Sequence, residues 1–207
     1  MSVQINNKKG FTLIELLIAI AIIGILSATS MVMFTSAQKK ARDSQRKNDL
    51  NQVKKAMIAA RNDCLGGYYP RGTASITTSS SEQTAFTNEL LPVLDGTKSN
   101  YLFYLKAQNL RDPLNGTTYH YGFKAAINTS TFPAVASVCR DTLSTYGYDG
   151  TPTFVLRALL EQGAKDPDAN SSYTNCQTII GYVAAWAGTA AEPTPASGDG
   201  YYYVCGN

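Results

Sequence analysis

The pattern of hydrophobic and polar positions separates an apolar N-terminal segment from a longer, mixed remainder in this chain of 207 residues. No charged residue occurs from Leu16 to Gln38, and this run is long enough to cross a hydrocarbon core, which needs roughly 20 apolar residues. It is too long for the apolar region of a secretory signal, about 7–15 residues. A plain membrane anchor would carry no acid near its start, yet Glu15 lies in the first turn of the run. An ionisable residue at that depth indicates a function.

The apolar segment is predicted to continue as one long helix, from Thr12 to about Asp63, because neither proline nor glycine occurs at positions 26–65. Such a helix would measure about 80 Å at 1.5 Å per residue. In its second half, apolar residues recur at spacings of three and four and therefore share one face, which is expected to pack on a sheet. These residues are Leu50, Val53, Met57, Ala60 and Cys64. The side chains of Lys47, Lys54, Lys55 and Arg61 are expected to be solvated or to contact neighbouring molecules.

Turn signals follow this helix. Gly66-Gly67 is expected to end it, and the chain through Pro70 and the Thr/Ser-rich stretch 73–81 is typical of a surface loop. Ser79 and Glu82 have the spacing of a capping box, which predicts a short helix that ends before Pro92.

The remaining sequence has the period-two alternation of strands. Alternation at 119–123 predicts a strand after the turn around Asn115-Gly116, and 146–148, a turn at 149–152 and 153–160 predict a hairpin. Positions 182–186 and 201–204 are further strand candidates. A long N-terminal helix packed on an antiparallel sheet gives an α+β fold class.

Composition adds little, but the distribution of charge is informative. The apolar fraction of 44% allows one sizeable core. The net charge is only +3, but the positive charge is concentrated in a basic stretch that contains only two acids, Asp43 and Asp49. The basic residues are Lys39, Lys40, Arg42, Arg46, Lys47, Lys54, Lys55 and Arg61. Phosphate contacts from such a stretch carry no sequence information, so a nucleic acid is not an expected partner.

The N-terminus carries the most specific motif. A short basic leader ends at Gly10, and Phe-Thr-Leu-Ile-Glu-Leu-Leu then opens an aliphatic stretch that reaches Leu26. This arrangement resembles the prepilin signal of type IV pilins and pseudopilins. The resemblance implies cleavage between Gly10 and Phe11, N-methylation of Phe11, and a role for Glu15 in assembly. Gly24 matches a glycine at which the helix loosens within many pilin filaments, although the proline that often follows eight residues later is replaced here by Val32.

The resemblance also implies a domain organisation and a set of partners. Residues 1–10 would be the prepilin leader, 11–38 the transmembrane and polymerisation helix, 39–65 its amphipathic continuation, and 66–207 an extracytoplasmic pilin head. The implied partners are a prepilin peptidase/methyltransferase, the lipid bilayer before assembly, further copies of the chain in a helical filament, and, indirectly, an inner-membrane platform with its assembly ATPase.

The implied location is the inner, or cytoplasmic, membrane, with a single pass, the N-terminus inside and the head outside, followed by an extracellular filament. The positive-inside rule alone favours the opposite orientation, because more Lys and Arg follow the apolar run than precede it. The motif outweighs the charge count. The expected function is a structural subunit of a type IV pilus-like filament. The alternatives are a pseudopilin of a type II secretion system and, ranked last, a DNA-uptake pilin.

The four cysteines of a head outside the cytoplasm imply two disulfides, for which the sequence permits three pairings. We favour Cys64 with Cys139 and Cys176 with Cys205. Positions 110–162 contain an Asp-Pro and an Asn-Gly turn and Tyr-x-Tyr pairs, followed by a Phe-Val-Leu-Arg-Ala strand. This series resembles the heads of major pseudopilins. The longer tail, with its two cysteines, is similar to pilins whose tail is held by a disulfide.

The sequence offers no candidate for catalysis. It lacks the nucleophile elbow, the phosphate-binding loop and the zinc-protease helix motif, and its single histidine, His120, lies in a predicted strand. The positions Asp166, Asp168 and Asn170 lack the glycine and distal glutamate of a calcium loop and are expected to form a solvated turn. We therefore expect neither an enzyme, nor a cofactor, nor a metal site.

Overall fold

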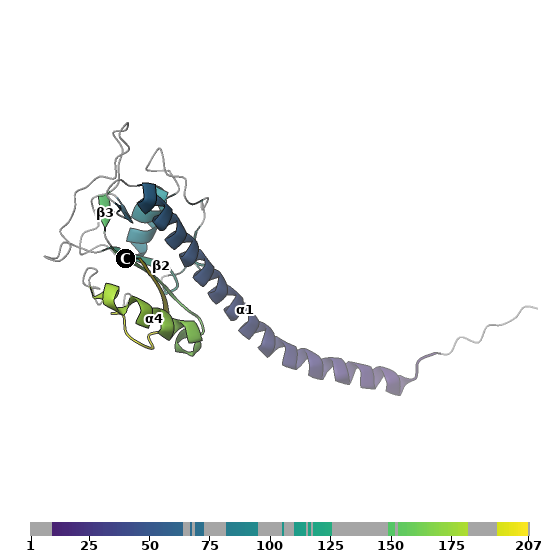
Figure 1. Cartoon of the computed structure of the whole chain (residues 1–207). Coiled ribbons are helices and arrows are strands. Elements are labelled where there is room, and N and C mark those ends of the chain that lie inside the picture. The colour runs from purple at the N-terminus through teal and green to yellow at the C-terminus, as the bar shows by residue number, and fades with distance from the viewer. Residues whose placement is uncertain are drawn as a thin grey trace, which may run out of the picture. The chain divides into compact units, whose positions relative to one another are not determined.

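The computed structural model describes residues 10–63, 67, 69–72, 82–94, 105, 110–114, 116, 118–125, 149–151, 153–181 and 194–206. The chain divides into two compact units, residues 1–40 and 41–207, and we call residues 66–207 of the second unit the head. Figure 1 shows its elements.

Helix α1 spans Leu13–Asp63, a length of 51 residues, and thereby confirms the predicted long helix. It is the single helix within the described residues that is long and apolar enough to cross a membrane, a property that signal sequences share. In its second half, the predicted stripe is confirmed for Leu50, Val53, Met57 and Ala60, whose side chains are all fully buried. Cys64 lies outside the described residues.

The head contains a three-stranded antiparallel sheet in the order β2-β4-β5. Strand β2 is Tyr121–Ala125, β4 is Phe154–Leu159 and β5 is Tyr201–Gly206. The strand predictions at 119–123, 153–160 and 201–204 are confirmed, each with bounds shifted by one or two residues. The order follows from register: Phe123 pairs with Leu156, and Leu156 pairs in turn with Val204.

Two hydrophobic clusters use opposite faces of this sheet. Phe154, Leu156 and Ala158 of β4 belong to the main core, which also contains the buried stripe of α1. The alternate residue Val155 belongs to a second cluster, with Cys176 from helix α4 (Pro167–Ile180). Because strand side chains alternate, β4 is covered on both faces, by α1 on one and by α4 on the other.

Helix α4 was not predicted. The sequence suggested a solvated turn at 166–170, but Asp166 is the N-cap of α4 and its carboxylate accepts from the backbone N–H of Asp168 at 2.9 Å. Pro167 stands in the first turn, where its missing N–H costs nothing. What looked like turn chemistry is therefore the start of a helix.

The expected loop and turn around residues 70 and 150 form a second, two-stranded sheet. Strand β1 (Tyr69–Gly72) pairs antiparallel with β3 (Asp149–Thr151), so the predictions of a surface loop through Pro70 and a turn at 149–152 are wrong at these residues. Pro70 fits a strand because the register shifts between Pro70 and Gly72, and proline is tolerated at such irregularities.

The short helix near residue 90 extends further than predicted. It consists of α2 (Glu82–Thr84), a π-helical turn η1 (Ala85–Leu90) and α3 (Leu91–Leu94), and it continues past Pro92. The backbone N–H of Leu91 bonds to the carbonyl of Phe86, five residues back. The π-helical turn ends at Leu90 and an α-helix begins at Leu91, so Pro92 lies in the first turn of α3. Proline is tolerated there because a first turn does not need its backbone N–H as a donor.

Chain reversals beside the sheet depend on glycine. A 3-10 turn, η2 (Gly163–Lys165), follows β4, and Gly200 at φ +82° precedes β5. A Cβ at Gly200 would lie 2.9 Å from the Cα of Gly163, so the backbones are too close for a side chain. The predictions at Ser79, Tyr146–Tyr148, Tyr182–Trp186 and Cys139 lie outside the described residues.

Candidate processing and assembly site

The first turn of α1 is held by a reciprocal pair, Thr12 and Glu15. The backbone N–H and the hydroxyl of Thr12 donate to Oε2 of Glu15 at 2.9 Å and 2.7 Å, and the N–H of Glu15 donates to Oγ1 of Thr12 at 3.3 Å. This is a capping box, in which an N-cap hydroxyl and a glutamate three residues later satisfy each other's donors. The sequence pattern implied a role for Glu15 in assembly, and this local role of its carboxylate is an additional finding.

The predicted cleavage site immediately precedes the cap. Gly10 and Phe11 both lie outside the helix, and Phe11 is 92% exposed. A peptide bond outside regular secondary structure and exposed to solvent is accessible to a protease, so the local structure is compatible with cleavage after Gly10.

The first 22 residues of α1 present apolar side chains that the described part of the chain leaves uncovered. The exposed ones are Leu13, Ile14, Leu16, Leu17, Ile18, Ile20, Ile22, Ile23, Ile25, Leu26, Met31, Met33 and Phe34. An exposed apolar surface of this extent marks a site that contacts membrane or protein. Gly24 lies within this part of α1, and a Cβ added to it would meet open space, with no atom outside its own helix backbone within 4 Å.

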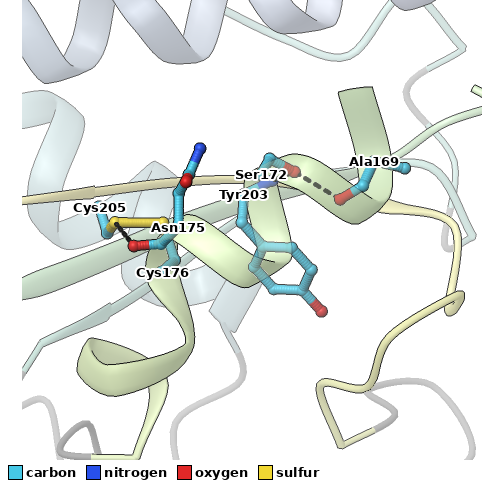
Figure 2. The surroundings of a disulfide bond; sticks show 6 residues. All are labelled: Ala169, Ser172, Asn175, Cys176, Tyr203 and Cys205. Carbon is cyan, nitrogen blue, oxygen red and sulfur yellow. Dashed lines mark hydrogen bonds between the residues drawn. A yellow bond between two sulfur atoms is a disulfide. The ribbon is translucent and has the colours of Figure 1, made fainter. Parts of the chain in front are cut away.

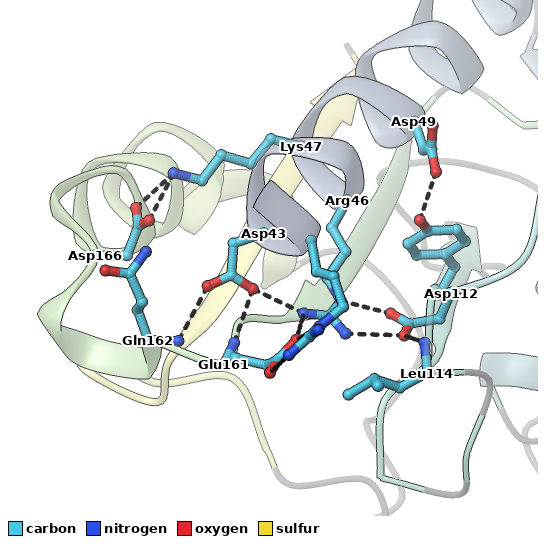
Figure 3. Close-up of polar contacts among 11 residues, drawn as sticks. Asp43, Arg46, Lys47, Asp49, Asp112, Leu114, Glu161, Gln162 and Asp166 are labelled. Atoms are coloured by element: carbon cyan, nitrogen blue, oxygen red, sulfur yellow. Dashed lines mark hydrogen bonds and ion pairs between the residues drawn. The ribbon is translucent and has the colours of Figure 1, made fainter. Parts of the chain in front are cut away.

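Three carboxylates surround Arg46, which is fully buried (Figure 3). Its Nε and Nη2 donate to the two oxygens of Asp112 at 2.6 Å and 2.9 Å, and its Nη1 donates to Asp43 at 2.7 Å and to Glu161 at 3.1 Å. Its guanidinium also lies 4.7 Å from the ring centre of Tyr119. Burial alone would lower the pKa of Arg46, but the bonds to Asp112 and the other carboxylates outweigh it and raise the pKa.

The same network fixes the chain that leaves β4. Asp43 accepts from the backbone N–H groups of Glu161 and Gln162 at 2.8 Å and 3.0 Å. Arg42 forms a bidentate pair with Glu161, at 2.6 Å and 2.7 Å. The hydrogen bonds from Arg42 lower the pKa of the Glu161 carboxyl, burial opposes this, and Arg46 adds to the lowering. One turn of α1 therefore holds both the 161–162 segment and the loop that carries Asp112.

Lys47, Arg61 and Asp49 make further polar contacts between α1 and the head. Lys47 Nζ donates to Asp166 at 2.6 Å and to Asp168 at 2.7 Å, so the expectation that Lys47 is solvated or contacts another molecule is wrong. Arg61 likewise donates to the carbonyl of Gly67 at 2.8 Å. Tyr121 donates to Asp49 at 2.6 Å, and burial raises the pKa of the Asp49 carboxyl against the lowering effect of that bond.

The disulfide between Cys176 and Cys205 confirms one predicted pairing and joins α4 to β5 (Figure 2). Ser172, one turn earlier on α4, adds a polar link: its hydroxyl donates to the carbonyl of Ala169 at 2.7 Å and accepts from the N–H of Tyr203 at 3.0 Å. Cys64 and Cys139 lie outside the described residues, and their pairing remains a prediction.

A sequence signal for the Arg46 network did exist. Asp43 and Arg46 precede Leu50, Val53 and Met57 at the same spacings of three and four, so they continue the buried stripe. Hydrophobic periodicity considers apolar residues alone, so it does not place Asp43 and Arg46 on the buried face. Their partners, Asp112 and Glu161, lie in connecting segments that carry no periodic pattern.

Within the described residues, no three His, Cys, Asp or Glu side chains gather in a way that could hold a metal ion. The described residues form an exposed segment at Gly10 and Phe11, a capped helix with an apolar first part, and an ion-paired attachment of the later part of that helix to the head.

Comparison with known proteins gives two matches, and the family match lies at the N-terminus of this chain. Residues 5–31 match the prokaryotic N-terminal methylation motif. The type IV wide pilus major component PilA4 of Thermus thermophilus is 56% identical over 39 residues, which are 19% of this chain and 30% of that protein. The match thus spans less than a third of the relative's length. No solved structure matches the chain. The chain carries a prepilin-type methylation motif, which implies processing by a prepilin peptidase, and a distant similarity to a type IV pilin.

Proposed function

We propose that this chain is a structural subunit of a type IV pilus-like filament, cut between Gly10 and Phe11 and assembled through the first part of α1. The observation that carries the proposal is the coincidence of the methylation motif at 5–31 with the exposed apolar surface of α1. A membrane covers such a surface before assembly, and the equivalent surfaces of other copies cover it afterwards. The function is structural, and no catalytic role is proposed.

The domain organisation follows from the same proposal. Residues 1–10 are the leader, 11–38 the membrane and polymerisation segment, 39–65 its continuation, and 66–207 the extracytoplasmic head. The N-terminus lies on the cytoplasmic side, Phe11 is N-methylated after cleavage, and an assembly platform with its ATPase extracts the subunit. Gly24 is the point at which the helix loosens in the filament.

Glu15 has the central part in assembly. Cleavage leaves a cationic amine on Phe11 of each mature subunit, and a staggered neighbour can bring that amine to the carboxylate. Among the described residues, the structure gives hydrogen bonds to Oε2 alone, both from Thr12, so Oε1 is available to a second donor. Pairing would neutralise both charges as the subunit leaves the lipid, where an unpaired carboxylate costs about 2.5–3.5 kcal/mol at mid-membrane and less near an interface.

The test is Glu15→Gln, which keeps the shape and removes the charge. We expect normal insertion and cleavage but little filament in the fraction sheared from cells that make only this variant. The matched control is Thr12→Val, which removes the hydroxyl of the capping box but leaves the carboxylate, and should retain filaments. If the two variants assemble equally well, Glu15 has no part in the mechanism. If Glu15→Gln is inserted and cut poorly, its role lies before assembly.

The second candidate is a pseudopilin of a type II secretion system, which the similarity of the 110–162 series to pseudopilin heads favours. A DNA-uptake pilin is less well supported, because three of the basic residues on α1, Arg42, Arg46 and Lys47, are paired with acids of the head. Imaging of cells with an antibody to the head separates the first two. Long surface filaments that contain this chain support a pilus subunit, and their absence together with a secretion defect supports a pseudopilin.

A further inference from the structure

Helix α4 carries a sequence signal that the proposed function does not use. Asn170-Ser171-Ser172 is an Asn-x-Ser sequon, the acceptor of N-linked glycans in secreted proteins. Two further sequons begin at Asn115 and Asn128, and both asparagines lie outside the described residues. A motif of three residues also arises by chance, so the surroundings of Asn170 decide whether it can carry a glycan.

The two ends of the Asn170 side-chain amide have different surroundings. The backbone N–H of Gly198 donates to Oδ1 of Asn170 at 2.9 Å. Only the oxygen of an amide accepts such a bond, so Nδ2 points the other way. Asn170 is exposed, and its Nδ2 makes no hydrogen bond within the described part of the chain. The atom that bears the sugar in an N-linked glycan is therefore accessible, while the oxygen holds the side chain in place.

The hydroxyl of the same sequon is occupied in the folded head. Ser172 is 7% exposed, and its hydroxyl donates to the carbonyl of Ala169 and accepts from the N–H of Tyr203 (Figure 2). One turn further along α4, Cys176 is joined to Cys205 of β5. A transferase that recognises the sequon needs this hydroxyl. It therefore cannot use Asn170 once α4 lies against β5.

We infer that Asn170 is N-glycosylated and that the glycan is added before α4 packs against β5. The inference rests on the extracytoplasmic position of the head in the proposed function. The donor is a lipid-linked oligosaccharide pyrophosphate, used by a membrane transferase. Nδ2 of Asn170 attacks carbon C1 of the first sugar, so an N–C bond forms and the bond from C1 to the pyrophosphate oxygen breaks. Nδ2 loses one proton, and the lipid pyrophosphate leaves.

The folded head accommodates the product of this reaction. Glycosylation leaves Oδ1 of Asn170 free to keep its bond to the N–H of Gly198. The neighbouring helix positions Ser171 and Thr174 are exposed, so a glycan on Nδ2 extends into solvent. The bond between Ser172 and Tyr203 can then form as it does without the glycan. The order is therefore modification, packing of α4, and closure of the disulfide.

Trypsin places the three sequons on separate peptides. Cleavage after Lys and Arg puts Asn115 in peptide 112–124 and Asn128 in peptide 125–140. Asn170 falls in peptide 166–207, because no Lys or Arg follows position 165. The full chain is purified from the cells that naturally make it, reduced and digested. We expect mass spectrometry to find peptide 166–207 with the added mass of an oligosaccharide.

Variants of the full chain assign this mass to the sequon. Asn170→Gln and Ser172→Ala should both lose it, whereas Ser172→Thr, which keeps a hydroxyl at the same position, should retain it. The matched control is Asn175→Gln, which changes an exposed asparagine of the same helix and the same peptide outside any sequon. This control should carry the glycan as the unmodified chain does.

Replacement of both Cys176 and Cys205 by serine tests the order of events. Without the disulfide, α4 is held less firmly on β5, so the sequon stays accessible for longer. The modified fraction of chains labelled in a brief metabolic pulse should therefore rise above that of the unmodified chain. An equal or lower fraction overturns the proposed order.

Cleavage after Gly10 and closure of the Cys176–Cys205 disulfide separate the failure of this inference from that of the proposed function. If chains that are cut and disulfide-bonded have no added mass on peptide 166–207, the inference is overturned and the proposed function stands. Added mass that persists in Asn170→Gln is attached to another residue and also overturns the inference. If the chains are neither cut nor disulfide-bonded, the proposed function fails and the inference fails with it.

Discussion

Replacement of Arg46 by methionine should be among the most destabilising single changes in residues 41–207. The guanidinium is fully buried, and the side chains of its partners Asp112 and Asp43 are 1% and 2% exposed. Methionine fills a similar volume but leaves two carboxylates in a dry environment without their cation. Removal of one member of a buried ion pair costs about 3–5 kcal/mol. For a chain of this size, that loss lowers the melting temperature by about 6–20 °C.

Asp112→Asn should cost less than Arg46→Met. Arg46 keeps Asp43 and Glu161 as partners, and the asparagine oxygen can still accept from the N–H of Leu114, which bonds to Asp112 at 2.9 Å. Hydrogen bonds to charged groups contribute about 1.5–3 kcal/mol, and this range is the expected loss. Arg42→Gln serves as the control at a partly exposed ion pair. Arg42 is 28% exposed in its pair with Glu161, and solvent screening makes its effect on melting the smallest of the three.

The double variant distinguishes two sources of the loss. If the cost of Arg46→Met comes from stranded carboxylates, then neutralising one of them in Arg46→Met/Asp112→Asn should recover part of the stability. If the cost comes only from lost packing, the second change should add to the first. Thermal unfolding of the full chain in detergent, followed by near-ultraviolet circular dichroism of the packed tyrosines, compares the unmodified chain with the four variants. An Arg46→Met protein that melts with the unmodified chain refutes the reasoning, as does a double variant less stable than Arg46→Met.

Three further predictions concern other parts of the chain. Gly10→Glu should accumulate uncut precursor in the membrane, whereas the unmodified mature protein should start at Phe11 with the mass of one added methyl; an intact leader on assembled protein contradicts this. Replacing Cys176 and Cys205 by serine should lower the free energy of unfolding by about 2–4 kcal/mol and so lower the melting temperature. Reducing agent should change the melting temperature of this variant less than that of the unmodified chain. The effect of Glu161→Gln should depend on pH. Because the pKa of Glu161 is lower in the folded chain than its usual 4.5, its contribution is present above about pH 4.5 and is lost as the pH falls through the folded value. The melting difference between variant and unmodified chain should therefore shrink in acid, and a constant difference between pH 7 and pH 3 argues against an ion-pair origin.

The long helix and the main strands could be predicted because each is encoded locally. Leu50, Val53 and Met57 have helical spacing, and Phe154 to Leu159 is a β-rich run between turn signals. The exposed apolar part of α1 was equally predictable, since it depends on composition alone. The methylation motif is predictable for the same reason: its residues are contiguous, so no knowledge of the fold is needed to find it.

The missed features depend on partners far apart in the sequence. Tyr69–Gly72 is a strand because Asp149–Thr151 pairs with it. Neither segment has a local pattern that predicts this pairing. Asp166 begins a helix rather than a solvated turn, and its carboxylate is held by Lys47, 119 residues earlier. Short polar segments have weak intrinsic preferences, so tertiary contacts decide their structure. Where those contacts are ion pairs, hydrophobic periodicity does not detect them.

Two charged residues of α1, Arg46 and Glu15, have different kinds of partner. Arg46 finds three carboxylates within its own chain, so its charge is compensated in the isolated subunit. Glu15 receives only the hydrogen bonds of Thr12 among the described residues, and these supply dipoles rather than a countercharge. A carboxylate that leaves water for lipid or for an apolar filament core requires a cation or a proton. The Arg46 network therefore belongs to folding, whereas the proposed pairing of Glu15 belongs to assembly, and only the Glu15 pairing should depend on the cleavage that exposes the amine of Phe11.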